Sequence, residues 1–97
     1  MVNFQEVKNR INPILKRSDV EFAGIFGSYA RGEETSDSDI DVLIRFQNPK
    51  SLIDIIGLEQ ELSEAIHIKV DLITQKALCP YIAPRVYEDL KTVYGKR

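Results

Sequence analysis

Hydrophobic residues near the start of the chain recur at the spacing of one helical face. They are Phe4, Val7, Ile11, Ile14 and Leu15. This period predicts an amphipathic helix over residues 3–16. Pro13 lies inside the stretch and is expected to kink the helix or end it early, because proline lacks the amide hydrogen that a helix interior uses.

Two short apolar runs follow, and each has the length of a strand. Residues 20–26, VEFAGIF, end at Gly27, and residues 40–46, IDVLIRF, end before Asn48-Pro49. Both runs predict buried strands. The intervening residues 27–38 are rich in glycine, serine and charge, which predicts a single helical turn and an exposed loop.

The second half of the chain repeats the alternation of helix and strand. Ser51 and Asp54 resemble a capping box at the start of a helix whose apolar face is Leu52, Ile55, Leu58, Leu62 and Ile66. Residues 68–74 predict a third strand. After Pro80, a final helix is predicted from the spacing of Ile82, Val86, Leu90 and Val93.

Length and charge narrow the class of protein. The 97 residues fit a single domain, 1–97, and the net charge of -2 argues against a protein that coats nucleic acid. One cysteine, Cys79, and one histidine, His67, are too few for a disulfide framework or a zinc site. We expect Cys79 to be a half-buried apolar side chain. Without a signal peptide or an apolar run of about 20 residues, we expect no membrane partner and a cytoplasmic location.

The residues most informative about chemistry are Gly27-Ser28 and the triplet Asp39-Ile40-Asp41. Because strand side chains alternate faces, Asp39 and Asp41 should point the same way. Two carboxylates aimed at one place repel each other, so a fold keeps them only with a positive group between them or in open water. A divalent cation is the usual solution, and Mg²⁺ prefers such oxygen ligands together with substrate phosphates. Glycine allows close approach of the backbone, and a hydroxyl at a helix start can join the amides in binding phosphate.

Two further residues complete this candidate site. Asp71 is the one acidic residue of the predicted third strand, and a neighbouring strand could bring it to the same metal ions. Arg31 adds a permanent positive charge near Ser28, which suits neutralisation of phosphate.

Three segments together resemble a known family. GSYARG at 27–32, SDIDVLI at 38–44 and VDLI at 70–73 are similar to the Gly-Ser, Asp-x-Asp and later Asp signature of the polymerase-β-type nucleotidyltransferases. Within that superfamily, the chain resembles the minimal nucleotidyltransferases (MNT), the antitoxins of HEPN/MNT toxin–antitoxin pairs. The resemblance implies an α/β (α+β) fold with a small mixed sheet of about three strands flanked by helices.

The resemblance also implies an activity, a cofactor and a partner. It implies transfer of AMP from Mg-ATP to a tyrosine of a cognate HEPN ribonuclease toxin, which inactivates that toxin in a complex of the two proteins. Carried over by position, Gly27, Ser28 and Arg31 would bind the triphosphate. Asp39, Asp41 and Asp71 would be the catalytic residues and would hold two Mg²⁺ ions.

Other interpretations stay open at this point. Taken alone, Gly-Ser is usually a turn, and Asp-x-Asp is usually a solvated strand end. A chain with this signature could also be an antitoxin that neutralises its partner by binding alone, with the motif kept as scaffold. Nucleotidyl transfer to a small molecule is a third interpretation, disfavoured because such enzymes usually carry an added helical domain for the acceptor.

Overall fold

The structure is a computed structural model that describes residues 3–97, and it contains one mixed sheet with helices on both faces. The helices are α1 (Phe4–Arg17), α2 (Ser28–Arg31), α3 (Leu52–Ile66), α4 (Ala83–Asp89) and the 3-10 turn η1 (Gln75–Ala77). The strands are β1 (Val20–Phe26), β2 (Ile40–Phe46), β3 (Val70–Thr74) and β4 (Lys91–Gly95). Their order across the sheet is β3-β2-β1-β4, with only β2 and β3 parallel. This arrangement confirms the predicted fold class.

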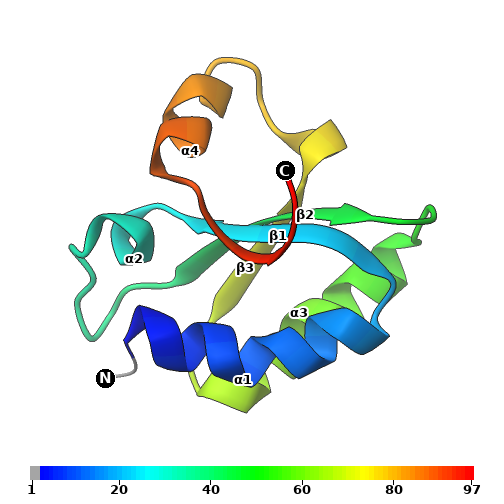
Figure 1. The fold of residues 1–97 in the computed structure, drawn as a ribbon, viewed down its shortest axis with the longest axis horizontal. Helices are drawn as coiled ribbons and strands as arrows, with labels where there is room; N and C mark the ends of the chain where they lie inside the picture. Colours follow the sequence, from blue (N-terminus) through cyan, green and yellow to red (C-terminus); the bar gives the residue numbers. More distant parts are fainter. Residues whose placement is uncertain (1–2) are drawn as a thin grey trace.

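The two faces of the sheet are covered unequally. Helices α1 and α3 lie together along one face, while α4 and the segment before it stand over the other (Figure 1). The main core lies on the α1 and α3 side and takes alternate residues of the strands, among them Ile25, Ile40, Val42 and Val70. A smaller cluster on the other face consists of Phe26 and Leu43 of the sheet and Val86 of α4. The α4 face is therefore the more open one, and polar side chains can gather on it.

Local signals fix both long helices. The side chain of Asn3 accepts a hydrogen bond of 2.9 Å from the Glu6 amide and caps α1. The helix continues through Pro13 to Arg17, so the expected early end is wrong. Both bonds of the predicted capping box are present at the start of α3, between Ser51 and Asp54.

The C-terminal segment departs from the sequence prediction. Helix α4 ends at Asp89, and the chain then forms β4 against β1, so the sheet has four strands rather than about three. Val93 is 2% exposed, but it is buried as a strand residue in the main core. The spacing of Val86, Leu90 and Val93 fits a helical period by coincidence, because pairing with a strand about 70 residues earlier leaves no local trace.

Smaller differences concern single positions. Strand β3 begins at Val70, later than the predicted start at residue 68. Cys79 is exposed rather than half-buried, because it lies in the connection between η1 and α4. Across residues 3–97, the structure has no helix of the length and apolar character that crossing a membrane requires.

Candidate active site

The centre of the candidate site is a pair of carboxylates on neighbouring strands. Asp41 of β2 and Asp71 of β3 are register partners in the parallel ladder. Their sequence neighbours Ile40, Val42 and Val70 are buried in the core on the α1 and α3 side. Because side chains alternate along a strand, Asp41 and Asp71 both point to the α4 face. The fold thus brings together two residues separated by 30 positions.

Asp39 lies beside this pair, one residue before β2 begins. Alternation from Asp41 places it on the same face, and its side chain is exposed. Partial burial raises the pKa of Asp41, and the negative charges of Asp71 and then Asp39 raise it further. All three carboxylates therefore interact electrostatically across one small area.

Gly27 forms the wall next to Asp41. It follows β1 with φ 79° and ψ -152°, a conformation that side-chain-bearing residues rarely adopt. A Cβ placed on Gly27 would lie 2.5 Å from Asp41 Oδ2. Only the absence of a side chain at position 27 leaves room for the carboxylate.

Ser28 begins the single turn α2 directly after this glycine. The Gly27 carbonyl accepts hydrogen bonds of 3.1 Å from the amides of both Ala30 and Arg31. Tyr29 and Ala30 are buried, so they anchor the turn to the core. Gly27 and Ser28 consequently lie at a fixed backbone position at the end of β1, next to Asp41.

Arg31 lies at the end of the same turn and is paired with two acids. Its Nε donates to Glu33 Oε1 at 2.7 Å, and its Nη1 donates to Asp89 Oδ2 at 2.6 Å. Its charge also lowers the pKa of Asp41, although burial and the neighbouring carboxylates have the opposite and larger effect. Arg31 is near enough to act electrostatically on Asp41, while its Nε and Nη1 donate to Glu33 and Asp89.

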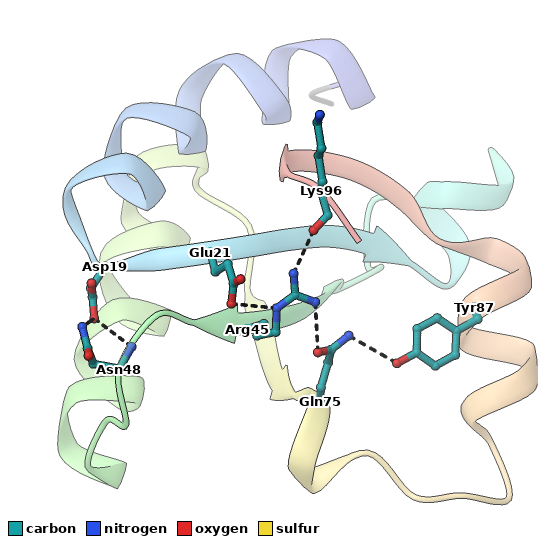
Figure 2. A network of polar contacts seen from close by, with 7 residues as sticks. All are labelled: Asp19, Glu21, Arg45, Asn48, Gln75, Tyr87 and Lys96. Atoms are coloured by element: carbon teal, nitrogen blue, oxygen red, sulfur yellow. Dashed lines mark hydrogen bonds and ion pairs between the residues drawn. The ribbon is translucent and has the colours of Figure 1, made fainter.

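A polar network fixes the other end of the same face. Arg45 Nε donates to Glu21 at 2.9 Å, and its two Nη atoms donate to Gln75 at 3.3 Å and to the Lys96 carbonyl at 2.8 Å (Figure 2). Gln75 in turn donates to the Tyr87 hydroxyl at 3.4 Å. These contacts join β1, β2, η1, α4 and the C-terminal segment, so they hold α4 in place over the sheet.

Comparison with known proteins identifies this arrangement. Residues 9–97 match the protein family described as Polymerase beta, Nucleotidyltransferase. The matched range contains every residue of the candidate site. The chain belongs to the polymerase beta nucleotidyltransferase family.

Two curated proteins show the range of similarity. The chain is 41% identical over 88 residues to the provisionally named protein adenylyltransferase MJ0435 of Methanocaldococcus jannaschii, covering 91% of this chain and 95% of that protein. It is 33% identical over 94 residues to the protein adenylyltransferase MntA of Thermococcus cleftensis, covering 93% of this chain and 95% of that one.

Solved structures show the same fold. A toxin–antitoxin crystal structure with AMP-PNP superposes with a TM-score of 0.82 at 25% identity, covering 93% of this chain and 74% of that chain. A complex of a tri-AMPylated Shewanella oneidensis HEPN toxin with an MNT antitoxin gives a TM-score of 0.75, covering 95% and 72%. At 23% identity, the second similarity concerns the fold alone.

The three carboxylates of this nucleotidyltransferase match magnesium in chemistry, since Mg²⁺ takes oxygen ligands and is held by few carboxylates plus phosphate. Across residues 3–97, no three histidine, cysteine, aspartate or glutamate side chains are already gathered at the spacing of a metal-binding cluster. The donor set fits the ion in chemistry, because Asp41 and Asp71 are register partners and the charge of Asp39 also acts on Asp41.

The sequence did not predict surface clefts or contacts between residues far apart in the chain. A cleft of about 380 Å³, lined by residues such as Arg45, Lys50 and Thr74, lies at the far end of β2 and contains none of the candidate site residues. The candidate site is the carboxylate group outside this cleft, and a domain of 97 residues is expected to leave such a site shallow. Asp89 was also missed as the partner of Arg31, since a contact across 58 positions leaves no signal in spacing.

Proposed function

We propose that this chain is a protein adenylyltransferase that moves AMP from magnesium-bound ATP to a tyrosine hydroxyl of a HEPN toxin and thereby acts as its antitoxin. The observation that carries the proposal is the pairing of Asp41 with Asp71 in the β2–β3 register, with Gly27 against Asp41. The names of the two curated relatives support a protein as acceptor. The superposed toxin–antitoxin structure with AMP-PNP supports a toxin as partner.

In this proposal, Asp39, Asp41 and Asp71 would hold two Mg²⁺ ions. Bound there, the ions would supply positive charge that offsets the negative charge of the triphosphate during transfer. The raised pKa of Asp41 reflects partial burial beside two other acids, and a bound cation would offset this effect. Repulsion from the two neighbouring carboxylates destabilises ionised Asp41. The same negative charges favour binding of a divalent cation.

The remaining roles are to bind the nucleotide and to remove the proton of the acceptor. Gly27 lets the triphosphate approach the backbone, and Ser28 offers its hydroxyl and amide to phosphate oxygens. The acceptor oxygen forms a bond to the α-phosphorus while the bond from that phosphorus to pyrophosphate breaks. Asp71 helps to take the proton from the acceptor hydroxyl. Arg31 leaves one of its acidic partners to neutralise phosphate charge.

Growth of cells that produce a cognate HEPN toxin separates catalysis from simple binding. Wild type and an Asp39→Asn, Asp41→Asn variant are produced with the toxin, and complex formation is measured by co-purification. We expect the variant to co-purify with the toxin but to leave the cells inhibited. Full rescue by the variant would contradict the proposal and favour an antitoxin that acts by binding alone.

A further inference from the structure

Strand β3 lies at the edge of the sheet and carries Asp71 as its second residue. An edge strand pairs on one side only, so alternate amides of its backbone face outward without a strand partner. The outward-facing amides on either side of Asp71 are those of Val70 and Leu72. Their hydrogen bonds determine how firmly the third carboxylate of the site is held.

Helix α3 supplies acceptors for both of these amides. The Val70 amide donates to Ser63 Oγ at 2.9 Å, and the Leu72 amide donates to Glu59 Oε2 at 2.8 Å. Ser63 Oγ in turn donates to the Glu59 carbonyl at 2.8 Å. Glu59 and Ser63 lie one helical turn apart. Together they offer β3 two hydrogen-bond acceptors, which a neighbouring strand would otherwise supply.

Packing of α3 in the core supports these contacts. All three hydrogen bonds are partly buried, and α3 is anchored in the core by Leu58, Leu62 and Ile66. The bond to Glu59 is made to a charged acceptor, which makes it stronger than a neutral one. The two α3 side chains bracket Asp71 while its carboxylate points to the opposite face.

We infer that Glu59 and Ser63 are positioning residues that fix the backbone on both sides of Asp71, and so set the place of its carboxylate relative to Asp41. This inference rests on the proposed function, because it concerns the metal site that Asp71 would complete. Neither residue touches the substrate. They keep the Asp71 carboxylate on the edge strand β3 from shifting away from the Asp41 carboxylate on the central strand β2.

Manganese binding tests the inference without relying on catalysis. Mn²⁺ is titrated into the protein with a non-hydrolysable ATP analogue, and free Mn²⁺ is followed by electron paramagnetic resonance. Loss of outer contacts to metal ligands commonly costs about 10-fold or more in affinity. We expect Glu59→Ala and Ser63→Ala each to weaken Mn²⁺ binding by roughly 10-fold. Amide hydrogen exchange should become faster at Leu72 in the first variant and at Val70 in the second.

Conservative variants separate positioning from general stability. Glu59→Gln and Ser63→Thr keep an oxygen acceptor and should bind Mn²⁺ within about threefold of wild type. Glu64→Ala, at an exposed position of the same helix, is the control for removing a charge from α3. Because Ser63→Ala deletes one small polar atom, it keeps the test valid even where Glu59→Ala fails to fold.

The possible failures are distinct. Unchanged Mn²⁺ affinity in both alanine variants, with faster exchange at Val70 and Leu72, would reduce Glu59 and Ser63 to caps of the sheet edge and overturn the inference. Absence of Mn²⁺ binding by wild type would remove the metal site itself and with it both the inference and the proposed function. Normal Mn²⁺ results without AMP transfer to a partner would contradict the proposed function alone.

Discussion

Asp41 and Gly27 are complementary in shape, since the carboxylate of one occupies the space that a side chain on the other would fill. The distance from a Cβ at position 27 to Asp41 Oδ2 would be 2.5 Å, shorter than any ordinary contact. The glycine is therefore needed for the site itself as well as for the turn. This relationship leads to the first prediction.

Gly27→Ala should reduce AMP transfer by about 100-fold or more, because displacing a catalytic group by even 1 Å can have that effect. It should also lower the free energy of unfolding by about 1–3 kcal/mol through backbone strain. Gly32→Ala is the matched control, since Gly32 also has a positive φ, 72°, but has open space around it. Transfer rates and urea unfolding of both variants check the prediction. An equal loss of rate in the two variants would show that strain alone is responsible.

Asp41→Asn should make the protein more stable near neutral pH. Burial raises the pKa of Asp41 above its unfolded value, so the folded state favours the protonated acid. The stability that Asp41 contributes as a protonated acid is fully present below its unfolded pKa. It is lost as pH rises through its folded pKa. The asparagine variant cannot ionise, so its advantage should be present near neutral pH and should vanish by about pH 3.

Urea unfolding of wild type and Asp41→Asn across this pH range measures the difference. Asp37→Asn, in the exposed loop before β2, controls for the change in net charge. If Asp41→Asn were less stable than wild type near neutral pH, the ionised carboxylate would be stabilising the fold, contrary to this account.

Arg31→Ala should raise the KM for ATP by roughly 10-fold, because one charge-assisted hydrogen bond contributes about 1.5–3 kcal/mol. Its effect on unfolding should be small, since Arg31 is exposed and exposed ion pairs contribute little. Asp89→Asn weakens one partner of Arg31 but keeps the guanidinium, so it should leave KM unchanged or lower it. Steady-state kinetics distinguish these outcomes. A similar rise of KM in Asp89→Asn would indicate that the ion pair, rather than free Arg31, serves the nucleotide.

Helix α3 offers two substitutions with opposite effects on stability. Ser51→Ala removes half of the capping box and should cost about 1 kcal/mol. Gly57→Ala, where a Cβ meets nothing within 4 Å, should gain about 0.5–1 kcal/mol. Thermal and urea unfolding should show both changes, and transfer rates should not follow them. A parallel change in rate would mean that overall stability, and not the local site, limits activity.

Local patterns were sufficient for most of the fold. Residues 20–26 and 40–46 were predicted as strands with the bounds that the structure has, because apolar β-branched runs bounded by glycine or proline have few alternatives. The start of α3 was equally readable from Ser51 and Asp54. Each of these features is decided within a few residues of sequence.

Features that depend on contacts between distant parts of the chain could not be predicted from the sequence. The strand at Lys91–Gly95 exists because β1 offers it an edge, and its exposed residues give no clear alternation. In the candidate site, Asp39 and Asp41 could be placed on one face from alternation alone. The register that sets Asp71 opposite Asp41, the Arg31–Asp89 pair and the bonds from α3 to β3 all depend on tertiary packing.

The most direct test of the proposed activity is the intact mass of a cognate HEPN toxin after incubation with this protein, ATP and Mg²⁺. The Asp39→Asn, Asp41→Asn variant serves as the control. We predict that the toxin gains the mass of one or more AMP groups with wild type and none with the variant, and that peptide mapping places them on tyrosine. A toxin of unchanged mass in a stable complex with wild type would contradict the account and leave binding as the means of neutralisation.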